Sequence, residues 1–171
     1  MPKSSSKAFK SASGLKNEIK GFLTHYGRVI TRYNRPISAY FEIATFHYVE
    51  RYYRERDWSV DPMNIQVGAS GERFFKHKCS PTGYPHNFSY LRLSRTIRGR
   101  DHCVELRQNV RVASEHTEKV TYTPDVAILE AGALSSDPRP EYHGGSRLLH
   151  YVPNAGLLSF MEAKHMVPFP E

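Results

Sequence analysis

The chain has 171 residues, which suits one domain with a short tail, and 39% of them are apolar, enough for a single core. No apolar run approaches the roughly 20 residues that cross a membrane, and the start lacks the apolar centre of a secretory signal. Two cysteines exclude a disulfide framework, so we expect a reducing, intracellular location, cytoplasmic or associated with the nucleoid.

The net charge of +7 belongs to the N-terminal segment. Residues 1–36 contain eight lysines and arginines against one acidic residue, whereas basic and acidic residues balance in the rest of the chain. Such a segment either attracts a polyanion, nucleic acid first, or serves as a solubilising tail.

Residues 1–14 have the composition of a disordered basic tail. Apolar residues then recur at helical spacing over 15–32, although two glycines weaken the pattern. After Pro36, a longer helical pattern runs from Ile37 to about Arg56 and contains Glu42 and Glu50. Two helices are therefore expected before any long strand.

The second half of the chain has the pattern of consecutive strands. We expect strands at 87–97, 103–113, 121–129 and 157–166, with a turn at 98–101 and a long insert at 131–156. In the second strand Glu105 is predicted on the polar face and Gln108 on the apolar face. Either one is a candidate contact to the site ligands or to nucleic acid, but ordinary strand-surface residues are the favoured interpretation. The order of elements predicts an α+β domain over 15–166. Its N-terminal helices would pack on a central mixed sheet of three to four consecutive strands.

Two of these strands carry charged residues beside apolar ones. Asp125 follows a proline at the start of one strand, and Glu162 and Lys164 are two residues apart on the last strand, so they project to the same side. If the two strands are neighbours, two carboxylates and an ammonium converge. Oxygen ligands of this kind suit Mg²⁺ or Mn²⁺. Apolar flanks predict that Glu162 and Lys164 are buried, which is costly without a metal or partner.

Pro124-Asp125 followed by Glu162-Ala163-Lys164 resembles the motif of the PD-(D/E)XK nuclease superfamily, which has the restriction-endonuclease-like fold. The order of a glutamate-bearing helix, an alternating strand, Pro-Asp and Glu-X-Lys is also similar. The resemblance covers roughly residues 36–166 and is carried by a handful of positions.

The resemblance implies a role for each of these residues in metal-dependent hydrolysis of DNA by water. Asp125, Glu162 and the Ala163 carbonyl would bind Mg²⁺ or Mn²⁺, and Lys164 would orient the attacking water. Glu42 would be the helical glutamate, with Glu50 as second choice. The basic N-terminal segment would hold the phosphate backbone, of DNA or of RNA, through Lys16, Lys20, Arg28, Arg32 and Arg35.

The sequence departs from the family pattern in two ways. Thirty-six residues separate Asp125 from Glu162, so the insert must loop out. Residues 167–171 follow where the family continues with a helix and a strand, so we expect a fragment, a homodimer or partner chain that completes the sheet, or a degenerate activity. The alternatives are a non-catalytic nucleic-acid-binding or assembly module with the nuclease fold, and a protein-interaction domain with a basic tail.

Overall fold

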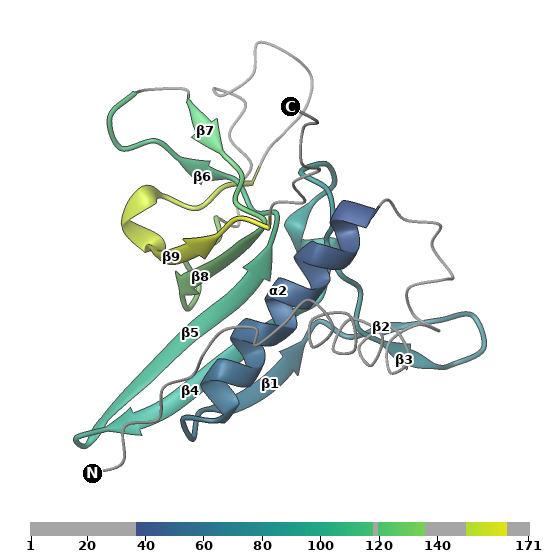
Figure 1. Ribbon diagram of the computed structural model, residues 1–171, viewed down its shortest axis with the longest axis horizontal. Helices are drawn as coiled ribbons and strands as arrows, with labels where there is room; N and C mark the ends of the chain where they lie inside the picture. Colours follow the sequence, from purple (N-terminus) through teal and green to yellow (C-terminus); the bar gives the residue numbers. More distant parts are fainter. Residues whose placement is uncertain (1–36, 118–119, 136–149, 164–171) are drawn as a thin grey trace, which may run out of the picture.

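The computed structural model describes residues 37–117, 120–135 and 150–163. In these residues one long helix, α2 (Ile37–Arg54), crosses a five-stranded sheet (Figure 1). The helix begins directly after Pro36, as predicted, and buries Ala39, Ile43 and Phe46 at the spacing of one helical face. The predicted helix at 15–32 lies outside the described residues.

The five strands of the main sheet are β1 (Ser59–Met63), β4 (Tyr90–Ile97), β5 (Arg100–Gln108), β8 (Val126–Glu130) and β9 (Leu157–Met161). They are arranged in the order β1-β4-β5-β8-β9, and each neighbouring pair is antiparallel. The α+β class is therefore confirmed. The predicted mixed sheet of three to four strands is wrong, because the short segment after Trp58 adds β1 to the edge and every described pair in this sheet runs antiparallel. Pro62 is tolerated in β1 because an edge strand has one unpaired side.

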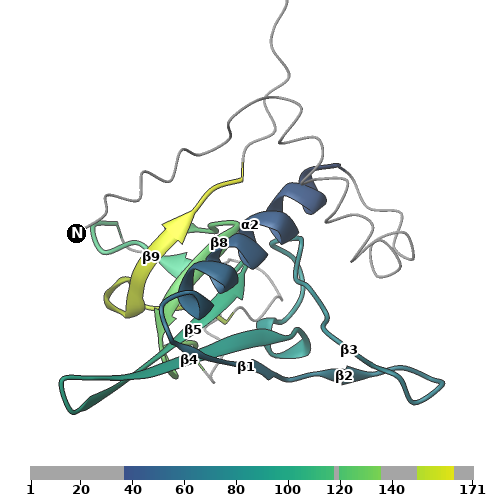
Figure 2. The ribbon, with the colours of Figure 1, turned by 60° about the horizontal axis from the view of Figure 1, so that its bottom comes forward.

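Smaller elements surround the sheet (Figure 2). One hairpin is formed by β2 (Gln66–Val67) and β3 (Arg73–Phe74), and another by β6 (Val112–Ala113) and β7 (Thr121–Tyr122). Single turns of 3-10 helix, η1 (Pro85–Asn87) and η3 (Asn154–Gly156), precede β4 and β9. Among the described residues, no helix is long and apolar enough to span a membrane.

Strand β8 separates two hydrophobic cores. Val126 and Ile128 pack in the core that contains Phe46 of α2, whereas Ala127 and Leu129 pack in a second core with Leu134. Successive side chains of a strand point to opposite faces, so a strand covered on both faces reads as a continuous apolar run. This double coverage explains why residues 126–129 contain no polar side chain.

Both ends of the predicted insert are packed against the second core. Tyr151 and Val152 are buried, and Val152 forms a parallel bridge with Val112. The Val152 amide donates to the Arg111 carbonyl at 2.8 Å, and the Ala113 amide donates to the Val152 carbonyl at 2.9 Å. The expectation of a wholly irregular insert at 131–156 is therefore wrong at its ends; residues 136–149 lie outside the described part.

Two predicted strands are each interrupted. The strand expected at 103–113 bends at Asn109, whose φ of 48° is left-handed, and continues as β6. The strand expected at 121–129 is broken between Tyr122 and Val126 into β7 and β8. The sequence pattern concealed these breaks because apolar residues continue through them. Both breaks lie at the same end of the sheet, since Gln108 pairs with Val126.

Candidate functional site

Asp125 and Glu162 come from the ends of two neighbouring strands. In the antiparallel pair β8–β9, Val126 is opposite Met161, and continuing this register by one residue sets Asp125 opposite Glu162. The Ala163 amide donates to Asp125 Oδ2 at 2.7 Å, which keeps the end of β9 beside Asp125. Asp125 and Glu162 are therefore neighbours just beyond the paired ends of β8 and β9, and their joint role as metal ligands stays a prediction.

The surroundings of Glu162 differ from the prediction. Glu162 is exposed, and its strand neighbours Leu158 and Phe160 are each 51% exposed. Strand β9 lies at the edge of the sheet, so apolar flanks here do not imply burial. The prediction of a buried Glu162 is therefore wrong. Lys164 lies outside the described residues, as do Lys16, Lys20, Arg28, Arg32 and Arg35.

Asn109 connects α2 to the segment that carries Asp125. Its side-chain Nδ2 donates to Glu42 Oε2 at 2.8 Å, and its backbone amide donates to the Asp125 carbonyl at 3.1 Å. Asn109 is buried, and Glu42 and Asp125 are half-buried. The Asn109 side chain therefore holds Glu42 and the Asn109 backbone amide holds Asp125, although these two residues are more than 80 positions apart in the sequence.

Lys78 is a buried cation in the same network, and we did not predict it from the sequence. Its Nζ donates to the Asn109 carbonyl at 2.8 Å and to the Ser80 carbonyl, while Asn109 Nδ2 also donates to the Lys78 carbonyl at 2.9 Å. Burial, with a further contribution from the charge of Arg111, lowers the pKa of Lys78 to about 8, while Cys79 and Glu42 act to raise it. Segment 75–80 has no regular periodicity, so nothing in its pattern predicts that Lys78 points inward.

Glu50, the second choice for the helical glutamate, belongs to a different cluster. It accepts from His47 Nδ1 at 2.7 Å and from Arg54 Nε at 2.9 Å. Burial raises the pKa of Glu50, but the hydrogen bonds from His47 and Arg54 outweigh it, and the pKa lies below its usual value. Eight residues along α2 place Glu50 about 12 Å from Glu42. The contacts therefore favour Glu42 as the helical carboxylate of the candidate site.

Glu105 and Gln108 are not the surface residues that the sequence predicted. Glu105 is 3% exposed and binds Arg107 Nε at 2.7 Å, and the Arg107 guanidinium lies 3.5 Å from the centre of the Tyr90 ring. Gln108 is also buried, and its Oε1 lies 2.7 Å from His77 Nδ1. Because both faces of the second half of β5 are covered, Glu105 and Gln108 are buried with polar partners. Among the described residues, neither side chain is hydrogen-bonded to Asp125, Glu162 or Glu42, so both are part of the packed sheet rather than of the candidate site.

The donor chemistry of Asp125 and Glu162 fits a hard cation such as Mg²⁺, which takes one or two carboxylates and retains several waters. Among the described residues, no group of three or more His, Cys, Asp or Glu side chains is placed to hold a metal ion. Any further protein ligand would therefore come from a backbone carbonyl, such as that of Ala163, or through water.

A comparison of the chain with models of known protein families, with curated proteins and with solved structures finds no match. Inferences about its function therefore rest on the residues and contacts described above.

Proposed function

We propose that the protein is a divalent-metal-dependent nuclease of the restriction-endonuclease-like kind that hydrolyses phosphodiester bonds in DNA. The observation that carries the proposal is the placement of Asp125 opposite Glu162 at the shared end of β8 and β9, with Glu42 tied to the same end through Asn109. The sequence order of these residues matches the motif that they resemble. Asp125 and Glu162 would hold Mg²⁺ or Mn²⁺.

The proposed chemistry assigns separate tasks to the metal and to the chain. When bound, the metal supplies Lewis acidity and a polarised water. Asp125 and Glu162 would fix the cation at the strand ends, and the Ala163 amide holds the Asp125 carboxylate in place. Lys164 would orient the attacking water and stabilise charge that develops on the phosphate. Glu42, whose carboxylate accepts a hydrogen bond from Asn109 Nδ2, would act on the cation through water rather than as a direct ligand.

A second candidate is a non-catalytic nucleic-acid-binding or assembly module with the same fold. The observation that favours it is that Asp125 Oδ2 already accepts a hydrogen bond from the backbone amide of Ala163. A carboxylate with one oxygen engaged in this way can serve as a structural anchor between β8 and β9. The two candidates differ in whether cleavage accompanies binding.

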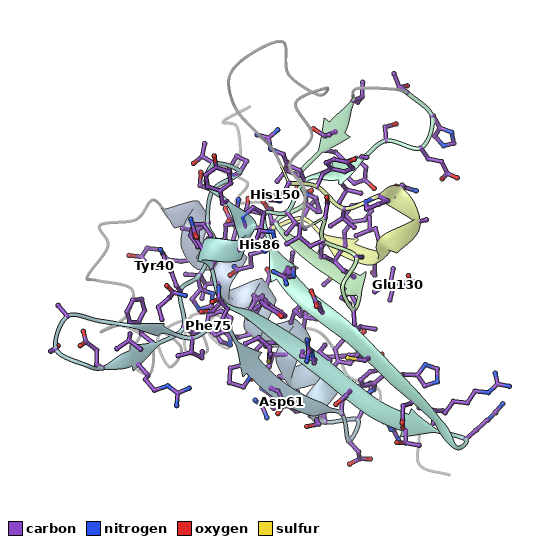
Figure 3. All side chains as sticks on the ribbon, turned by 180° about the vertical axis from the view of Figure 1, so that it is seen from behind. Tyr40, Asp61, Phe75, His86, Glu130 and His150 are labelled. Carbon is purple, nitrogen blue, oxygen red and sulfur yellow. The ribbon has the colours of Figure 1, made fainter. Side chains whose placement is uncertain are left out.

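The test is cleavage of supercoiled plasmid and duplex oligonucleotides by the full chain with Mg²⁺, Mn²⁺ or a chelator. The variants are Asp125→Asn, Glu162→Gln and Lys164→Met, and the matched control is Glu130→Gln at the opposite end of β8 (Figure 3). We expect the full chain to cleave DNA only when the metal is present. The rate of cleavage should fall at least about a hundredfold in each of the three site variants, because each removes a metal ligand or the water-orienting cation. The control should retain the full rate. Salt-sensitive binding without cleavage in any metal would favour the second candidate.

A further inference from the structure

The hairpin formed by β4 and β5 extends beyond the rest of the sheet. Pairing of β4 with β1 ends at Ser94, and pairing of β5 with β8 begins at Val104. Between these points lie residues 95–102, which we call the ribbon arm and which pair only with each other, from Arg95 opposite His102 to Ile97 opposite Arg100. Figures 1 and 2 both show this arm projecting at one end of the molecule.

The tip of the ribbon arm is basic and exposed. Arg98 and Arg100 are exposed at the turn, and no ion pair is found for either one among the described residues. The one acidic residue of the arm, Asp101, accepts a hydrogen bond from Thr96 Oγ1 at 2.6 Å. Arg95 is held at the base by the Arg56 carbonyl. The guanidinium groups of Arg98 and Arg100 are therefore exposed to solvent at the end of a two-stranded hairpin.

Arg98, at the tip of the arm, has a backbone conformation that is unfavourable for arginine. Arg98 and Gly99 have φ angles of 51° and 74°, and Ile97 pairs with Arg100, which defines a two-residue type I′ turn. Asparagine is preferred at the first central position because its side chain tolerates the left-handed region, whereas a long side chain there is uncommon. An arginine in this place is explained better by a ligand than by the turn.

We propose that the ribbon arm enters the major groove of duplex DNA, with Arg98 and Arg100 contacting guanine edges or phosphates. A two-stranded ribbon fits the major groove of B-DNA, which is about 12 Å wide, whereas the major groove of A-form RNA is too narrow for side chains to read. Ile97, 38% exposed, lies on the same face as Arg100 and supplies an apolar contact for a thymine methyl group.

The arm and the candidate site lie at opposite ends of β5. Nine residues separate Arg100 from Asn109, which corresponds to about 30 Å along the strand. This distance corresponds to about nine base pairs of B-DNA at 3.4 Å for each pair. The choice of DNA rests on the proposed function. The ribbon arm adds that the DNA is bound as a duplex.

The test measures binding without cleavage, so that failure of the arm and failure of the nuclease are distinguishable. The full chain with Asp125→Ala is titrated, in the presence of a chelator, against fluorescent duplex DNA, duplex RNA and single-stranded DNA at several salt concentrations. The variant Arg98→Asn/Arg100→Gln removes both tip charges and places a favoured residue in the turn. The control is Arg73→Gln, an exposed arginine in the β2–β3 hairpin.

We expect the double variant to bind duplex DNA about tenfold more weakly, with a shallower dependence on salt, because guanine or phosphate contacts are lost. Its binding to duplex RNA and to single strands should change by less than about twofold, and so should binding of duplex DNA by the control. The melting temperature should not fall, because asparagine suits the turn. Unchanged affinity for duplex DNA, an equal loss for all three nucleic acids, or no binding of duplex DNA at all would each overturn the proposal.

Discussion

Lys78 and Asn109 bind each other in both directions: Lys78 Nζ donates to the Asn109 carbonyl at 2.8 Å, and Asn109 Nδ2 donates to the Lys78 carbonyl at 2.9 Å. This reciprocal pair joins the loop before β4 to the end of β5. Because Asn109 also binds the Glu42 carboxylate and the Asp125 backbone carbonyl, the pair is connected to both of these residues. Substitution of either residue tests how much this network stabilises the fold.

Lys78 should make the stability depend on pH in the alkaline range. Its pKa is about 8 in the fold and 10.5 ordinarily, so below pH 8 both folded and unfolded chains carry the proton. Between pH 8 and 10.5 the unfolded chain binds more protons, and the free energy of unfolding therefore rises with pH. We expect a rise of about 1–3 kcal/mol. Urea unfolding at pH 7.5, 8.5 and 9.5 measures it, and Lys78→Met should abolish it; an equal rise in that variant would contradict the assignment.

Replacement of Asn109 should show two separable effects. Asn109→Ala loses the charge-assisted hydrogen bond to Glu42 and puts alanine in the left-handed region, which it tolerates less well than asparagine, so we expect a loss of about 3 kcal/mol in the free energy of unfolding. Asn109→Gly loses the same contacts but adopts a φ of 48° freely, and should be more stable than the alanine variant by about 1 kcal/mol. Urea denaturation of both proteins checks this order. If the alanine variant is as stable as the glycine variant, or more stable, the left-handed conformation at position 109 has no energetic cost.

The buried pair of Glu105 and Arg107 should be strongly non-additive. Arg107→Met leaves the Glu105 carboxylate, 3% exposed, without its cation, and should cost about 3–5 kcal/mol. Adding Glu105→Gln removes the stranded charge and should recover about 1–3 kcal/mol of that loss. Chemical denaturation of the single and double variants measures the coupling. Losses that simply add would mean that the two charges are stabilised by other groups.

Glu42 and Glu50 should differ in their response to metal. Glu42→Gln keeps an oxygen for Asn109 but removes the charge, so it should change the stability by less than about 1 kcal/mol. If Glu42 contributes to the proposed cation site, this variant weakens the Mn²⁺-induced rise in melting temperature. Glu50→Gln should leave that rise unchanged, because Glu50 binds His47 and Arg54. Thermal unfolding over a series of Mn²⁺ concentrations separates the two; a reduced rise in Glu50→Gln alone would reverse the assignment.

Local patterns predicted the elements whose form depends on neighbours in sequence. Helix α2 follows from apolar residues at helical spacing after Pro36. The turn at Arg98-Gly99 was expected because glycine favours positive φ. The pairing of β1 with β4 was not predicted, because strand neighbours are chosen by contacts between distant segments.

The sequence by itself determined the α+β class, the long helix and the order of the charged residues Glu42, Asp125 and Glu162. Only the tertiary structure decided that Asp125 and Glu162 follow the paired ends of β8 and β9, that Glu162 is exposed beside an edge strand, and that Lys78 and Glu105 are buried. The physical reason is that burial and register depend on what covers each face of the sheet. The segments that cover a face are distant in sequence, and both core packing and strand pairing bring them together. The pattern of one segment alone therefore does not predict burial or register.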